Sequence, residues 1–249
     1  MTPTEQLASW INESASTVFF GGAGVSTESG IPDFRSESGL YKARQVYGYP
    51  PEELLSHRFF VRNTELFFRY YRENLIAYEA KPNAAHIALA QWEARGLLKA
   101  VVTQNVDGLH QAAGSKVVWE LHGSNARQYC VKCRARYGLD YVLAREGVPQ
   151  CAACGGTVRP EVVLYGEQLD DSVVSAAVNA IAGAEMLIVG GTSLAVYPAA
   201  GLLRDFSGKH LVLVNKGETP FDSQADLVIR GAIGAVFGQL TMHIEWCSA

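Results

Sequence analysis

The 249-residue sequence contains little charge and few cysteines, and each shortage excludes a class of protein. Only 18% of its residues are charged, and 21 Lys+Arg against 25 Asp+Glu give a formal net charge of −4. This balance cannot hold nucleic acid or an anionic membrane by electrostatics alone, so we expect no direct binding to either. Five cysteines in a chain of this length do not indicate a disulfide scaffold. The 48% of apolar residues suffice for the core of one large domain, with or without an insertion.

Signals for secretion or membrane insertion are also missing. The N-terminus has neither a basic region nor an apolar run, so we expect no signal peptide and a cytoplasmic location. The least charged stretch, 186–203, approaches the ~20 residues of a membrane span. Gly190, Gly191 and Pro198 interrupt it, which favours a buried strand followed by a turn.

Six short apolar runs alternate with helical patterns along most of the chain. They read as strands at 17–20, 100–103, 117–120, 186–189, 211–214 and 227–229. Apolar strands with helices between them predict an α/β fold with a doubly wound, parallel, Rossmann-like sheet. Ligands of such sheets bind beyond the carboxyl ends of the strands. Glycines and small polar residues follow five of these strands, at 21–24, 104–107, 122, 190–193 and 215.

Two stretches do not follow the alternation of strand and helix. The stretch 34–78 is rich in aromatic and charged residues and predicts helices of its own, while 129–160 contains four of the five cysteines. We therefore expect a smaller domain, 35–78 and 129–160, inserted into a Rossmann-like domain of 1–34, 79–128 and 161–249.

The four paired cysteines are spaced C-x2-C-x17-C-x2-C, a pattern typical of structural zinc sites. The predicted ligands of one Zn²⁺ are Cys130, Cys133, Cys151 and Cys154. Four protein ligands leave no open position for water, so the ion would be structural. Two pairs of buried free thiols are the alternative interpretation. A redox role is disfavoured because neither pair opens a strand–helix unit.

The glycine loop after the first strand is suited to a dinucleotide phosphate, because glycines let the backbone approach it closely. Taken alone, the signal is weak. Thr27 stands in place of the third glycine, and no acidic residue ends the second strand, which disfavours a hydride-transferring dehydrogenase. An ordinary glycine-rich turn remains open on this segment alone.

Further strings around the strand ends resemble one family. GVSTESGIPDFR at 24–35, TQNVDGLH at 103–110 and LHG at 121–123, together with the cysteine pairs, resemble the sirtuins, NAD-dependent protein deacylases. The resemblance runs from about 15 to 237 in the family's motif order. Bacterial sirtuins with a compact zinc module look most similar, through KPNAAH at 81–86, RPEVVLYGE at 159–167, GTSLAVYPAA at 191–200 and VNKGETPFD at 214–222.

The resemblance implies roles for the polar residues at the strand ends. His122 would be the general base, since an imidazole with the ordinary pKa of ~6.5 accepts a proton near neutral pH; taken alone, it would more readily be a structural histidine. Asn105 and Gln104 would position the nicotinamide ribose and a water, while Asp107 and the Val106 backbone would hold the carboxamide. The other implied NAD contacts are Gly22, Ala23, Gly24, Thr27, Phe34, Arg35, Gly191, Thr192, Ser193, Asn215 and Ile233.

The implied reaction consumes NAD as a co-substrate. The acyl oxygen of a modified lysine attacks the anomeric carbon of the nicotinamide ribose, nicotinamide leaves, and the products are free lysine and O-acyl-ADP-ribose. A protein ADP-ribosyltransferase, a deacylase with another acyl preference and a non-enzymatic NAD-binding adaptor are the alternatives. A monomer is the expected oligomeric state.

The implied partner is an extended acyl-lysine peptide that adds as a strand between two segments. Its predicted contacts are Val163, Leu164, Tyr165, Gly166, Leu194 and Val196, although core packing explains any one of them equally well. Sirtuins that prefer succinyl or malonyl groups have a Tyr and an Arg where this chain has Phe68 and Tyr71. We therefore expect acetyl as the preferred acyl group. Arg69 and Arg72 lie so close in sequence to this position that a misalignment of a residue or two would change the expectation.

Overall fold

The large domain of the protein is built on a six-stranded parallel sheet. The computed structural model describes residues 1–33 and 43–240. The strands are β1 (Thr17–Gly21), β2 (Leu98–Thr103), β3 (Val118–Glu120), β7 (Met186–Gly190), β8 (His210–Asn215) and β9 (Leu227–Arg230). Every neighbouring pair is parallel. All six lie where the apolar runs predicted them, which confirms the doubly wound α/β fold.

The strand order β3-β2-β1-β7-β8-β9 contains one reversal of direction. The chain moves outward from β1 through β2 to β3, then returns to the other side of β1 with β7. The loops that follow β1 and β7 therefore diverge at the carboxyl edge, and ligands of open α/β sheets bind at such a crevice.

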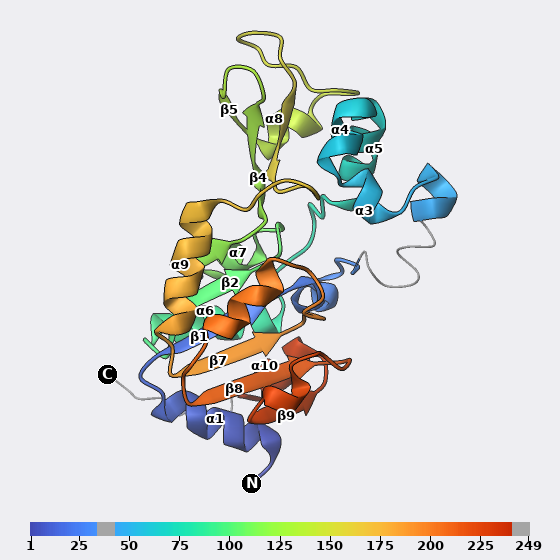
Figure 1. Cartoon of the computed structure of the whole chain (residues 1–249). Helices are drawn as coiled ribbons and strands as arrows, with labels where there is room; N and C mark the ends of the chain where they lie inside the picture. The colour runs from blue at the N-terminus through green and yellow to red at the C-terminus, as the bar shows by residue number, and fades with distance from the viewer. Residues whose placement is uncertain (34–42, 241–249) are drawn as a thin grey trace.

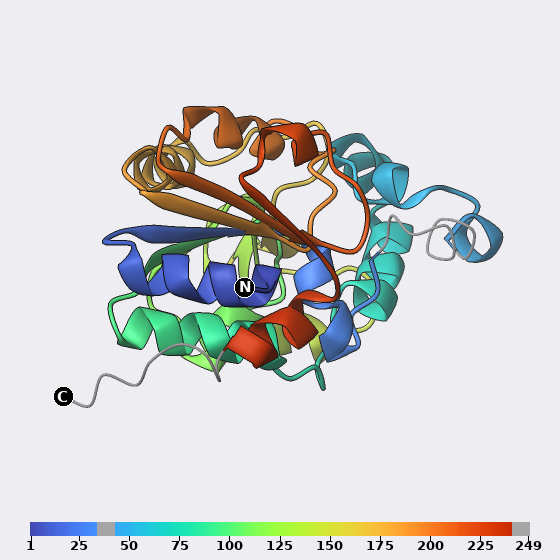
Figure 2. The ribbon, with the colours of Figure 1, turned by 90° about the horizontal axis from the view of Figure 1, so that it is seen from below.

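Helices cover both faces of this sheet, as Figure 2 shows. One face packs against α1 (Pro3–Glu13), α6 (Ala84–Ala94) and α10 (Ile233–Leu240), and the other against α9 (Asp171–Ala182) and η3 (Ala199–Asp205). Successive side chains of β1 point to opposite faces of the sheet and so belong to two separate cores. Phe19 packs in the core of the first face, and Val18 and Phe20 pack in that of the second. The short elements are η1 (Ala23–Val25), η2 (Thr27–Ser29), α7 (Leu109–Ala113) and η4 (Asp222–Gln224).

A smaller domain lies at one end of the molecule (Figure 1). Its antiparallel sheet has the order β5-β4-β6. The elements are β4 (Gly123–Cys130), β5 (Arg136–Gly138), β6 (Val158–Val162), α8 (Leu139–Leu143), α3 (Pro51–Leu54), α4 (His57–Arg62) and α5 (Thr64–Asn74). Phe67, Phe68, Tyr70 and Tyr71 place one face of α5 in a separate aromatic core. β4 already begins at Gly123, so its first residues pair with β6.

The apolar stretch 186–203 forms β7, a loop and part of η3. In the part of the chain that the structure describes, no helix has the length and apolar character needed to cross a membrane.

Candidate active site and metal centre

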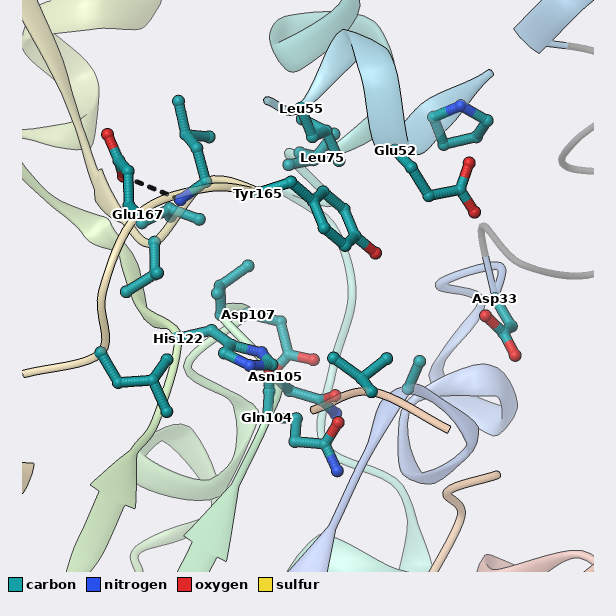
Figure 3. Close-up of a pocket in the computed structure, with 18 of the residues that line it drawn as sticks. Asp33, Glu52, Leu55, Leu75, Gln104, Asn105, Asp107, His122, Tyr165 and Glu167 are labelled. Carbon is teal, nitrogen blue, oxygen red and sulfur yellow. Dashed lines mark hydrogen bonds between the residues drawn. The ribbon is translucent and has the colours of Figure 1, made fainter. Parts of the chain in front are cut away.

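A cavity of about 250 Å³ opens beyond the carboxyl ends of β1 and β2, between the sheet and the smaller domain. Its floor carries polar side chains that follow β2 and β3, and its opposite wall is formed by the segment after β6 together with Leu55 and Leu75 (Figure 3). The predicted site residues that line it are Ala23, Gln104, Asn105, Val106, Asp107, His122, Val163, Leu164, Tyr165, Gly166 and Val196.

His122 stands between β3 and β4, so the backbone on both sides of it is held in a sheet. Its Nδ1 lies 2.9 Å from the carbonyl oxygen of Gln104. A carbonyl oxygen only accepts hydrogen bonds, so Nδ1 must carry the proton of the neutral ring. Nε2 then carries the lone pair. The contact with Gln104 thus gives His122 the tautomer that a general base requires.

A serine joins two of the predicted nicotinamide contacts. The Ser26 hydroxyl donates to Asp107 Oδ2 at 2.7 Å and accepts from Asn105 Nδ2 at 3.1 Å. Asp107 Oδ1 accepts a third hydrogen bond from the Leu109 amide, at the start of α7. Both carboxylate oxygens therefore have fixed partners. The motif GVST contains Ser26, but spacing alone could not show that it meets residues about 80 positions away.

Two buried histidines lie behind this cluster. The rings of His86 and His110 are 4.7 Å apart between centroids. Burial lowers the pKa of His86 to about 4, although the negative charge of Asp107 acts in the opposite direction. Burial, with help from His86, lowers the pKa of His110 to about 3. Both rings are therefore neutral at physiological pH and add no positive charge beside Asp107.

The glycine loops after β1 and β7 touch each other. A Cβ atom on Gly22 would lie 2.8 Å from Thr192, and one on Gly24 would lie 2.8 Å from Gly191. Gln104, which follows β2, donates from Nε2 to Thr192 Oγ1 at 3.3 Å. The end of β2 therefore joins those of β1 and β7 in the same crevice. Because the glycines have no side chains, the backbone of the two loops can approach a dinucleotide phosphate closely, at the point where the strand order reverses.

The remaining predicted contacts lie outside the cavity lining. Ile233 is 2% exposed and belongs to the core at the start of α10, and Leu194 is 1% exposed in the opposite core. Asn215 ends β8 and donates to the Gly217 carbonyl. The segment 194–196, which holds two of the predicted peptide contacts, forms bends and no strand. Phe34 and Arg35 lie outside the described residues.

Several cavity residues were not predicted. They are Ser26, Ile31, Pro32, Asp33, Pro51, Glu52, Leu55, Leu75, Val162, Glu167, Leu169, Tyr197 and Pro198. Leu55 and Leu75 lie near the ends of α3 and α5, where no periodicity in the sequence marks them as cavity residues. The lining includes four carboxylates, Asp33, Glu52, Asp107 and Glu167, and within the described ranges it contains no Lys or Arg.

The positions expected to select the acyl group are turned away from this cavity. Phe68 and Tyr71 are fully buried in the aromatic core, where Tyr71 Oη accepts from Gln128. Arg69 pairs with Glu73, and Arg72 donates to the carbonyls of Val142 and Arg145. Neither arginine side chain reaches the cavity, so neither places a cation there.

The four predicted zinc ligands come together in the smaller domain. The Sγ atoms of Cys130, Cys133, Cys151 and Cys154 all lie within 4.8 Å of one another, with two pairs at 3.5 Å. Tetrahedral zinc with ~2.3 Å Zn–S bonds separates its sulfurs by about 3.8 Å, so the cluster fits this ion. A Cβ atom on Gly156 would lie 3.0 Å from Cys130 Sγ, which explains the glycine there. The centre is fully thiolate and would serve a structural role.

Comparison with known proteins decides the family. The model of the Sir2 family matches residues 22–198, well over half of the chain. The chain belongs to the Sir2 family. The predicted resemblance to sirtuins is thereby confirmed, with the motif residues Gly22 to Pro198 inside the matched range.

Two curated relatives of this Sir2-family chain are named NAD-dependent protein deacetylase. The protein of Clostridium acetobutylicum is 59% identical over 93% of this chain and 95% of its own length. That of Clostridium tetani is 53% identical over 99% and 100%. Solved structures agree: Sir2 with a p53 peptide and NAD⁺ has a TM-score of 0.85 and 40% identity, covering 97% of this chain and 98% of its own. Sir2 with a deacetylated p53 peptide and 3′-O-acetyl-ADP-ribose has 0.86 and 40%, covering 96% and 97%.

Proposed function

We propose that this protein is an NAD-dependent protein-lysine deacetylase in which His122 is the general base. The observation that carries the residue assignment is the Gln104 carbonyl at 2.9 Å from Nδ1, which fixes the proton on Nδ1 and the lone pair on Nε2. The deacetylase activity is supported by relatives of that name at up to 59% identity across almost the whole chain. Free lysine, nicotinamide and O-acetyl-ADP-ribose would be the products.

The cavity floor would orient NAD. The two hydrogen bonds that Asp107 accepts fix its orientation, and the nearby His86 ring is neutral and does not compete for the carboxylate. The carboxylate is therefore suited to accept a hydrogen bond from the nicotinamide carboxamide. Gln104 and Asn105 would hold the ribose hydroxyls from the end of β2. Leu55 and Leu75 add apolar surface opposite these groups, and a less polar environment strengthens hydrogen bonds.

The wall after β6 would hold the substrate peptide along 163–166, by backbone hydrogen bonds that need little sequence preference. Because four carboxylates and no Lys or Arg of the described chain line the cavity, an acyl group with its own carboxylate would be repelled. Uncharged short acyl groups, acetyl first, fit this lining.

The four thiolates would hold one Zn²⁺ that stabilises the smaller domain and takes no part in the reaction. Cysteines that must stay reduced suit a cytoplasmic enzyme. We also propose a monomer that needs no nucleic acid, which light scattering and activity on an isolated peptide would check.

The decisive experiment is mass spectrometry of an acetyl-lysine peptide incubated with NAD. Wild type should form O-acetyl-ADP-ribose, and His122→Ala should lower the rate by roughly 10²–10⁴, the usual contribution of a general base. His210→Ala is the matched control, since His210 stacks on Trp10 far from the cavity. Absence of O-acetyl-ADP-ribose with wild type, or a peptide carrying ADP-ribose instead, would reject the proposal. Faster turnover of succinyl-lysine would reject only the acyl preference.

A further inference from the structure

An arginine with almost no exposure stands directly behind the predicted peptide-binding wall. Arg159, on β6, is 3% exposed, and each of its guanidinium nitrogens donates a hydrogen bond. Nε donates to the Pro160 carbonyl at 3.2 Å and Nη1 to Glu167 Oε1 at 2.6 Å. Nη2 donates to the Val162 carbonyl at 2.7 Å and to Glu167 Oε2 at 3.0 Å. The planar fork thus joins the start of the segment 162–167 to its end.

Glu167 passes this constraint on to the backbone of the segment. Its Oε2 accepts from the Leu164 amide at 2.8 Å, the dashed contact in Figure 3, while its own amide donates to the Leu164 carbonyl at 2.9 Å. Oε1 also lies 2.8 Å from His57 Nδ1. Burial alone would raise the pKa of Glu167, yet the hydrogen bonds from Arg159, Leu164 and His57 hold it below the ordinary value. The carboxylate is therefore charged when it holds the turn.

The segment closed in this way contacts the catalytic base. The Val163 amide donates to the His122 carbonyl at 2.9 Å. Tyr165 exchanges two backbone bonds with the smaller domain, donating to Leu55 and accepting from His57, each at 3.0 Å. Gly166 has a φ of +87°, which ordinary side chains rarely adopt. The backbone offered to the peptide is thus shaped around one ion pair.

Stability alone does not explain a buried ion pair here. Removing two charges from water costs about as much as their attraction returns, and apolar replacements are often equally stable. What the ion pair contributes is geometry, because a bidentate arginine–carboxylate pair fixes both the position and the orientation of the two groups. The two acceptor groups of Arg159 on this segment, the Val162 carbonyl and the Glu167 carboxylate, flank the residues predicted to bind the peptide.

We propose that Arg159 and Glu167 are positioning residues for the acyl-lysine peptide, holding the backbone of 163–165 in the conformation to which the substrate adds as a strand. This inference rests on the proposed deacetylase function. It concerns the peptide alone, because NAD is expected at the opposite side of the cavity, against Gln104 and Asp107.

Steady-state kinetics of Glu167→Gln test the proposal. The Michaelis constant for an acetyl-lysine peptide should rise about tenfold, the equivalent of ~1.4 kcal/mol, while kcat and the Michaelis constant for NAD stay within about threefold. Glu161→Gln is the matched control: it makes the same change six positions earlier, in a surface pair with Arg127 and Arg136, and should leave all three constants unchanged.

A second variant separates positioning from folding. Arg159→Met with Glu167→Leu replaces the ion pair by apolar side chains, which should retain the melting temperature within a few degrees. It still removes the acceptor for the Leu164 amide, so the peptide constant should remain raised. Parallel changes in the constants for peptide and NAD, or no change in either variant, would overturn the inference. If wild type itself forms no O-acetyl-ADP-ribose, the proposed function has failed instead.

Discussion

At the scale of single residues, the hydroxyl of Ser26 connects the loop after β1 with two side chains that follow β2. It is 1% exposed, donates to Asp107 and accepts from Asn105. A buried hydroxyl with both capacities used keeps its neighbours in one orientation. Two predicted NAD contacts therefore depend on a side chain that need not touch NAD.

Ser26→Ala should weaken NAD use more than it weakens the fold. Loss of one charged hydrogen bond and one neutral bond would lower kcat/KM for NAD about tenfold, at a cost of ~1–3 kcal/mol in stability. Kinetics at saturating peptide with denaturant unfolding check both quantities. Ser9→Ala, on α1, is the control; an unchanged kcat/KM for NAD in Ser26→Ala would contradict the prediction.

A phenol beside the metal centre carries a second residue-level prediction. Tyr137 Oη lies 3.0 Å from Cys151 Sγ and accepts from the Ala152 amide. A zinc-bound thiolate can only accept, so the phenol would donate to the sulfur when the metal is bound. Partners of metal ligands commonly contribute 10- to 100-fold in affinity. Tyr137→Phe should therefore release zinc about tenfold faster to a chromogenic chelator. Tyr141→Phe loses a bond to the Gln150 carbonyl instead and should release zinc at the wild-type rate.

At the scale of elements, the passage from the parallel sheet to the smaller domain depends on close contact of two strands. β4 begins directly after His122, and Gly123 pairs with Val162 on β6. Gly123 has a φ of +76°, and a Cβ atom there would lie 1.9 Å from the Glu161 carbonyl oxygen. Only glycine lets the two strands meet at this point while His122 faces the cavity.

Gly123→Ala should consequently disrupt the junction. Backbone strain of ~1 kcal/mol and a clash with backbone atoms that cannot rotate away together predict a loss above ~3 kcal/mol, with deacetylation abolished. Gly147→Ala isolates the strain, because Gly147 has a φ of +61° but open space around it. Thermal unfolding of both variants checks the difference. Equal melting temperatures would show that the close approach is unimportant.

At the scale of the whole molecule, stability should depend on pH through two buried imidazoles. His86 and His110 titrate near pH 4 and 3 when folded, against 6.5 ordinarily. The unfolded chain therefore binds more protons than the folded one below pH 6.5. The free energy of unfolding must therefore fall as the pH falls below 6.5. The stability that depends on these neutral rings is fully present only above pH 6.5.

Between pH 7 and 5, the expected loss is on the order of 2 kcal/mol for each of the two imidazoles. His110→Leu should remove about half of this loss, because leucine fills the site beside Phe19 without a proton to bind. Urea unfolding at both pH values, with zinc content confirmed, gives the measurement. The prediction is wrong if the variant loses as much stability as wild type.

Local sequence was sufficient for the strands, for the cysteine centre and for the motif residues that line the cavity. Apolar runs of three or four residues determine strands because burial on both faces leaves little choice of structure. The spacing of the paired cysteines determines the metal centre because two short turns present four sulfurs. The roles of His122, Asn105 and Asp107 stay predictions until the variants are measured.

Only the tertiary structure decided which side chains meet. Ser26 and Asp107 are 81 positions apart, Gln104 and Thr192 are 88 apart, and the histidine pair joins α6 to α7. Leu55 and Leu75 line the cavity and also pack against the aromatic core that holds one face of α5. Such contacts depend on how whole elements pack, and a sequence pattern that records only local spacing does not contain them. Sequence by itself therefore determined the chemistry available to this protein, and packing decided where its protons, carboxylates and peptide wall come together.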